Sequence, residues 1–173
     1  PPVGAGAAAV YADASSDGFG AWTLVGDELL LLEGEWSAAE RDGLTIAELE
    51  LLASTWALVA FAPWLPCFVT SWTDNTVAES AMRRLAPRAA AAQLVTARRS
   101  RWLFDAGVVE AAARVTTSAN LWADIASRPE LGGGGEVARQ AGLLGLRVRE
   151  VEVPAAWRGT ADLLLASGDE WRC

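Results

Sequence analysis

The chain contains no histidine, no lysine and only two cysteines among its 173 residues. Without histidine, and with Cys67 and Cys173 far apart, the usual ligands of a zinc site are missing. Two such cysteines also offer no disulfide framework, which fits a reducing compartment. We therefore expect an intracellular protein, in the cytoplasm or the nucleus.

Positive charge is scarce as well. The 14 basic residues, all arginine, are outnumbered by 22 acidic residues, and the net charge is −8. This balance argues against the strongly basic surface of a free nucleic-acid-binding domain, so any polyanionic partner must be met by local arginines. The sequence shows no secretory signal, and we expect no apolar run of the roughly 18–20 residues that span a membrane.

The 52% of hydrophobic residues can fill a sizeable core, and the length suits one domain with an appendage. Because the chain starts at Pro1 and not at Met, we expect it to be a segment of a longer polypeptide. The pattern predicts an α/β fold with a five-stranded mixed sheet flanked by helices, its first three strands antiparallel. The expected strands are Ala8–Ala12, Gly20–Val25, Glu28–Leu32, Cys67–Trp72 and Val108–Val115.

Helix signals follow the third strand. Thr45 and Glu48 form a capping box that opens a helix ending at about Phe61, before Pro63. Further helices are expected at Thr76–Leu85, Ala89–Asp105 and Leu121–Ser127. Arg98, Arg99 and Arg101 near the end of one of them either complement the helix dipole on a solvated face or form a phosphate-facing patch.

The four glycines Gly132–Gly135 are predicted to form a loop or linker. No Gly-Lys-Ser/Thr follows them, which excludes a phosphate loop. After them we expect a helix at Val137–Leu144, a strand within Leu146–Val153 and a last helix at Ala161–Ala166. The chain is thus divided into a domain at residues 1–130 and a C-terminal extension at residues 131–173, packed on that domain or linked to it.

Carboxylates recur at the ends of predicted elements. Asp13 follows the first apolar run, with no arginine before Arg41, and an isolated half-buried carboxylate is costly unless a metal or a distant cation meets it. A plain turn is the alternative, because Asp17-Gly18 is a good hairpin dipeptide. Asp74 follows the fourth strand in the same way, and Asp124 lies in a late helix. The order of elements would bring these acids to one edge of the sheet.

A second acid comes from the helix that begins after Thr45. Glu48 and Glu50 flank its apolar stripe on opposite sides, so periodicity alone cannot choose between them. Glu48 has an explanation of its own as the capping-box residue.

Four stretches together resemble the ribonuclease H family, most closely the domain attached to reverse transcriptases of DIRS-type and gypsy-type retroelements. They are Val10-Tyr11-Ala12-Asp13-Ala14-Ser15, Glu50-Leu51-Leu52-Ala53-Ser54-Thr55-Trp56-Ala57-Leu58, Thr73-Asp74-Asn75 and Asn120-Leu121-Trp122-Ala123-Asp124-Ile125-Ala126-Ser127-Arg128. The resemblance covers about residues 7–130.

This resemblance implies a ribonuclease H-like fold and metal-dependent cleavage of the RNA strand of RNA–DNA hybrids during reverse transcription. It selects Glu50 over Glu48, and it implies two Mg²⁺ or Mn²⁺ ions per site and a reverse transcriptase domain in the same polyprotein as partner. The implied catalytic and metal-binding residues are Asp13, Glu50, Asp74 and Asp124, and the implied substrate-binding residues are Ser15, Asn75, Arg114, Asn120 and Arg128. Four clustered carboxylates need such cations, because two of them ~5 Å apart repel by roughly 3 kcal/mol at an effective dielectric of ~20.

One position departs from the family pattern. Where cellular and many retroviral members carry a histidine, this chain has Arg114, whose guanidinium cannot accept a proton from water. Two other functions remain open at this stage: a non-catalytic connection or binding module with the same fold, and a DNA-acting nuclease of the same superfamily.

Overall fold

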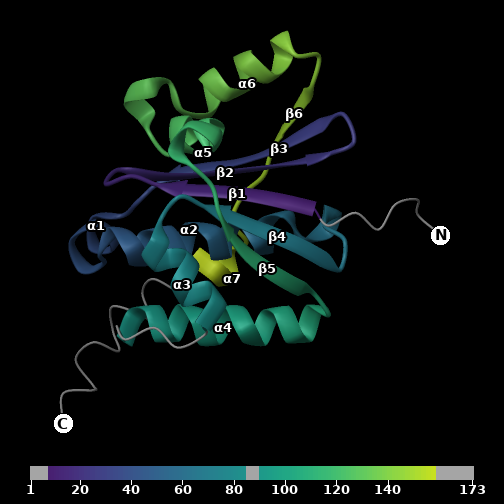
Figure 1. Cartoon of the computed structure of the whole chain (residues 1–173). Coiled ribbons are helices and arrows are strands. Elements are labelled where there is room, and N and C mark those ends of the chain that lie inside the picture. The colour runs from purple at the N-terminus through teal and green to yellow at the C-terminus, as the bar shows by residue number, and fades with distance from the viewer. Residues whose placement is uncertain (1–7, 85–89, 159–173) are drawn as a thin grey trace.

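The computed structural model describes residues 8–84 and 90–158, which form a six-stranded mixed sheet with helices on both faces (Figure 1). The strands lie in the order β5-β4-β1-β2-β3-β6. Their bounds are β1 Ala8–Ala14, β2 Gly18–Val25, β3 Glu28–Glu35, β4 Phe68–Thr73, β5 Val109–Arg114 and β6 Arg147–Glu150. The predicted α/β fold is confirmed, including the antiparallel β1, β2 and β3.

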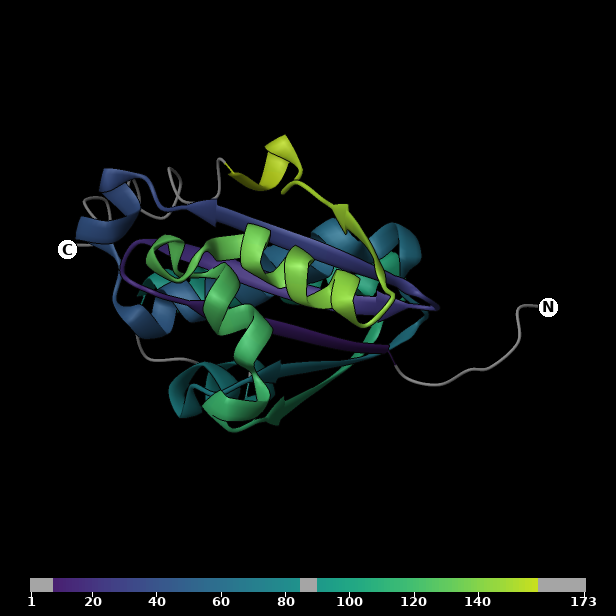
Figure 2. The ribbon, with the colours of Figure 1, turned by 90° about the horizontal axis from the view of Figure 1, so that it is seen from above.

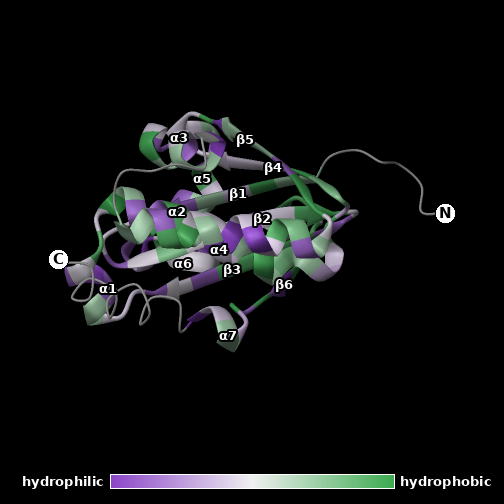
Figure 3. Ribbon diagram, turned by 90° about the horizontal axis from the view of Figure 1, so that it is seen from below, coloured by the Kyte–Doolittle hydropathy of each residue, from purple (hydrophilic) through white to green (hydrophobic). Residues whose placement is uncertain are grey.

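Two layers of helices enclose the sheet. The helices are α1 Ala38–Gly43, α2 Ile46–Phe61, α3 Thr76–Arg84, α4 Ala90–Ala106, α5 Leu121–Ala126, α6 Gly133–Leu143 and α7 Ala155–Arg158. Figure 1 shows α2, α4 and α7 below the sheet and α5 and α6 above it, and Figure 2 shows α6 running across β2 and β3. Figure 3 views the lower layer and shows hydrophilic residues on the outward side of α4.

The core is centred on α2, which packs between the sheet and α4. Residues 49–61 of this helix are all buried, with Trp56 and Leu52 fully enclosed. The stretch Ile46–Trp64 is long and apolar enough to cross a membrane by length and composition, which corrects the expectation that no run approaches that length. Because 72% of its apolar window is buried inside the fold, it is accounted for as the core helix.

The sheet has one strand more than the five expected for it. β6 comes from the C-terminal extension and pairs in parallel with β3, placing Val148 opposite Leu29. Further along, Trp56 Nε1 donates to the Trp157 carbonyl (3.2 Å), and the Arg98 guanidinium lies 4.4 Å from the Trp157 ring centroid. The extension is therefore packed against the rest of the fold as far as Arg158.

One local prediction was wrong, and one helix was missed. The glycine run is no loop, because Gly133 begins α6 and the Gly134 N–H donates to the Glu33 carboxylate. A Cβ at Gly134 would lie 2.5 Å from Glu33 Oε1, so glycine permits this close approach. Helix α1 was not predicted, although Ser37 and Glu40 form a capping box. The expected helix Ala161–Ala166 lies outside the described residues.

Candidate metal centre

Asp13, Glu50 and Asp74 come together at one edge of the sheet. Asp13 lies within β1, Glu50 on the first turns of α2, and Asp74 directly after β4. Strands β1 and β4 are parallel neighbours, and Tyr11 pairs with Trp72. Asp13 and Asp74 each follow one of these two aromatic residues by two positions, so they lie at the same end of the two strands. One carboxylate oxygen from each residue lies within 4.8 Å of the other two. These are hard oxygen ligands, which suit Mg²⁺ or Mn²⁺.

Two of these three acids, Asp13 and Glu50, have raised pKa values. Burial, followed by repulsion from Asp13 and Asp74, raises the pKa of Glu50 to about 9. Burial also raises the pKa of Asp13 to about 6, although the Ser127 hydrogen bond and the charge of Arg128 oppose this. Both groups are 4% exposed. A bound dication would supply the compensation that the described side chains give only in part.

Asp124 stands beside this group and is not part of it. Its Oδ1 accepts a hydrogen bond from Arg128 Nε at 2.8 Å, one turn further along the chain. Its charge still contributes to the raised pKa of Asp13. The structure thus assembles three of the four predicted acids and places the fourth alongside, paired with a guanidinium.

Glu48 and Glu50 now have different surroundings. Glu48 Oε2 accepts from the Thr45 N–H and the Thr45 hydroxyl, each at 2.8 Å, so Glu48 caps α2 as predicted. Glu50 is the acid of this helix that faces Asp13 and Asp74.

Three predicted substrate-binding residues hold the backbone around the acids. Ser15 Oγ donates to the Ser127 carbonyl (2.6 Å), and Asn120 Nδ2 donates to the Ala12 carbonyl (3.1 Å). Asn75 Oδ1 accepts from two backbone N–H groups in the first turn of α3. The side chain of Asn120 is fully buried, so its hydrogen bond gives it a structural task. Contact of these residues with a substrate stays a prediction.

The arginines named in the sequence analysis have different surroundings. Arg114 is exposed at the end of β5, opposite Thr73. Arg101 pairs with Asp105 on the solvated side of α4. Arg99 lies neither on a solvated face nor in a phosphate-facing patch, because it is 1% exposed and paired with Glu110. Both alternatives stated for it are therefore wrong. Its Nη1 also donates to Thr55 Oγ1 at 2.8 Å, which ties α4 to α2.

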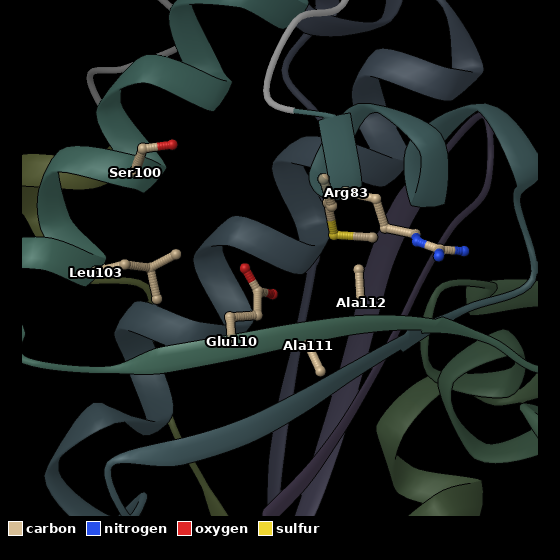
Figure 4. A pocket seen from close by; sticks show the side chains of 7 residues that line it. Arg83, Ser100, Leu103, Glu110, Ala111 and Ala112 are labelled. Atoms are coloured by element: carbon tan, nitrogen blue, oxygen red, sulfur yellow. The ribbon is translucent and has the colours of Figure 1, made fainter.

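A pocket of about 530 Å³ lies between α3, α4 and β5, with Glu110 of this ion pair on its wall (Figure 4). It is lined by Met82, Arg83, Ser100, Leu103, Glu110, Ala111 and Ala112. None of the four predicted acids lines it. The candidate metal centre and this pocket are therefore separate features.

Sequence reasoning missed two hydroxyl groups at the centre. Ser127 Oγ lies 2.8 Å from Asp13 Oδ2, and Thr73 Oγ1 lies 3.4 Å from Glu50 Oε2. Both residues belong to the stretches that carry the family resemblance, yet neither was assigned a task. A small hydroxyl residue close in sequence to an acid was the available signal.

No protein-family model matches the sequence, and no curated protein matches it. Among solved structures, the fold is similar to that of ribonuclease H1 from the halophilic archaeon Halobacterium salinarum, with a TM-score of 0.58 and 18% sequence identity. The similarity covers 69% of this chain and 92% of the archaeal chain. The chain therefore has a ribonuclease H-like fold.

Proposed function

We propose that this chain is a metal-dependent nuclease that cleaves the RNA strand of RNA–DNA hybrids. The observation that carries the proposal is the convergence of Asp13, Glu50 and Asp74 within 4.8 Å at the edge of a ribonuclease H-like sheet. The raised pKa values of Asp13 and Glu50 fit a site that is completed by cations. The similar archaeal structure is a ribonuclease H1, which supports the same reaction class.

The residues fit Mg²⁺ or Mn²⁺ because all of the available ligands are carboxylate oxygens. Asp13, Glu50 and Asp74 would hold one ion, and Asp124, once released from Arg128, would share a second ion with Asp13. When bound, such ions activate water and neutralise charge on the leaving oxygen. Arg128 and Arg114 are suited to hold phosphate oxygens, and neither guanidinium can act as a general base.

We further propose that the chain acts in reverse transcription of a retroelement, beside a reverse transcriptase domain of the same polyprotein. The sequence stretches around Asp13 and Asp124 support this context. The net charge of −8 supports a dependence on that neighbour, because the chain has few cations of its own to hold a hybrid. An intracellular location and a functional unit at residues 1–130 belong to the same proposal.

The test is cleavage of a labelled RNA–DNA hybrid, compared with duplex DNA, duplex RNA and single-stranded RNA, in Mg²⁺ and in Mn²⁺. We expect cleavage of the hybrid and of none of the other three substrates. The cleavage rate should be at least about 100-fold lower in Glu50→Gln. Glu48→Gln is the matched control, because it makes the same change two residues away and glutamine also completes a capping box. Its activity should equal that of the unaltered chain.

Each other outcome points to a different function. Cleavage of duplex DNA would favour a DNA-acting nuclease. Hybrid binding without cleavage, in the presence of the neighbouring polymerase domain, would indicate a non-catalytic module.

A further inference from the structure

The end of helix α5 fits closely against the hairpin of β1 and β2. A Cβ at Gly20 would lie 2.5 Å from both Ala126 Cβ and Ser127 N, and a Cβ at Gly18 would lie 3.0 Å from the Ser127 carbonyl oxygen. Ser15 Oγ donates to that same carbonyl oxygen at 2.6 Å. The backbone of Ser127 is therefore bonded to Ser15, two residues after Asp13, and packed closely against the glycines that follow.

The side chain of Ser127 points from this position to the candidate metal centre. Its Oγ lies 2.8 Å from Asp13 Oδ2 and 3.0 Å from the Asp124 carbonyl oxygen, and the residue is fully buried. A hydroxyl has one proton, and the closer, charged carboxylate is the stronger acceptor. Ser127 thus donates to Asp13 Oδ2, which restrains that oxygen and leaves Oδ1 without this donor.

We propose that Ser127 is a positioning residue of the metal centre. It orients Asp13 toward Glu50 and Asp74, and it connects Asp13 to the helix that carries Asp124. The inference rests on the proposed function, because it concerns the same acids. Residues that orient metal ligands in this way typically change metal affinity by about 10–100-fold when they are removed.

The alternative is that Ser127 only anchors α5. In that case its loss would lower the stability of the fold without changing how Asp13 meets a cation. Thr23 offers a matched comparison: its buried hydroxyl donates to the Ala9 carbonyl of the same strand β1 at 2.9 Å, but it touches no carboxylate.

The experiment is calorimetric titration of Mn²⁺ into the full chain. We expect Ser127→Ala to bind Mn²⁺ about 10–100-fold more weakly, and Ser127→Thr, which keeps the hydroxyl, to regain most of the affinity. Thr23→Val should lower the melting temperature but leave the affinity unchanged. If Ser127→Ala does not fold, Ser127→Cys serves the same comparison, because it keeps a similar volume and donates only weakly.

A second readout separates positioning from anchoring. Cleavage of the hybrid by Ser127→Ala should recover as the Mn²⁺ concentration rises, because only the affinity for the ion is reduced. Unchanged Mn²⁺ affinity in Ser127→Ala would overturn the positioning role while leaving the proposed function intact. Absence of Mn²⁺ binding by the unaltered chain would overturn both.

Discussion

Two glutamates with largely enclosed side chains in this fold have pKa values that are shifted in opposite directions. The Glu50 residue is 4% exposed and the Glu110 side chain is 8% exposed. Burial and the neighbouring acids raise the pKa of Glu50 to about 9. Burial acts in the same direction on Glu110, but the charge of Arg99 and the hydrogen bonds from Arg99 and Ser71 outweigh it and lower the pKa.

The difference lies in what each carboxylate meets. Glu110 receives Arg99 Nε at 3.0 Å and a second, shorter contact from Arg99 Nη2, so its charge is compensated within the chain. Glu50 meets two further carboxylates. The first arrangement is a completed structural ion pair, whereas the second is a site that needs a cation from outside. Changes at the two glutamates should therefore have opposite effects on stability.

The largest expected effect is at the completed pair. Glu110→Ala leaves Arg99 buried without its partner and should lower the free energy of unfolding by about 3–5 kcal/mol. For a chain of this length, that corresponds to a loss of about 10 °C in melting temperature. Thermal unfolding followed by circular dichroism measures it. The double variant Arg99→Met with Glu110→Leu should recover most of the loss, and a double variant as unstable as Glu110→Ala would refute this view of the pair.

A smaller change of opposite sign is expected at the incomplete site. Without metal at pH 8, the folded state keeps a proton on Glu50 or bears the repulsion of its neighbours, and Glu50→Gln removes both costs. The free energy of unfolding should rise by roughly 2 kcal/mol. Chemical denaturation in EDTA measures this, with Glu48→Gln as the neutral control. Destabilisation by Glu50→Gln, as for an ordinary core substitution, would mean that the acids do not repel one another as described.

The smallest effect is expected at the ion pair between Asp124 and Arg128. The Arg128 side chain is 41% exposed, so Arg128→Gln should change the free energy of unfolding by only about 0.3–0.5 kcal/mol. The same variant should weaken hybrid binding if Arg128 holds a phosphate. Denaturation and a binding titration on one preparation give both values. A stability loss as large as that of Glu110→Ala would show that this pair is structural.

The sequence was sufficient to predict the fold class because apolar runs and capping signals are local. Helix α2, with its start at Thr45 and its end before Pro63, is the clearest case. The pairing of β6 with β3 was not predictable in this way, because it joins residues more than a hundred positions apart. The helical glycines at the start of α6 were missed for the same reason, since Glu33, which accepts from the Gly134 N–H, lies far away in sequence.

The candidate site could also be predicted only in part from local sequence. Asp13 and Asp74 could be proposed from their places after strands, whereas the choice of Glu50 over Glu48 required the family resemblance. Arg99 lies between Arg98 and Arg101 in the sequence, and only its pairing with Glu110 of β5 shows why it is buried. Asp124 pairs with Arg128 four positions further along the chain, but its place outside the cluster of the other three acids was seen only in the structure.

The most direct test of the metal centre is the melting temperature from pH 5 to pH 9, with EDTA and with Mg²⁺. A carboxyl group whose pKa is raised by folding stabilises the fold below its unfolded pKa, and this contribution is lost as the pH rises toward the folded value. For Asp13 the loss extends to about pH 6, and for Glu50 to about pH 9. We expect the melting temperature in EDTA to fall across this range and Mg²⁺ to remove most of the fall. Curves that coincide with and without Mg²⁺ would contradict this expectation.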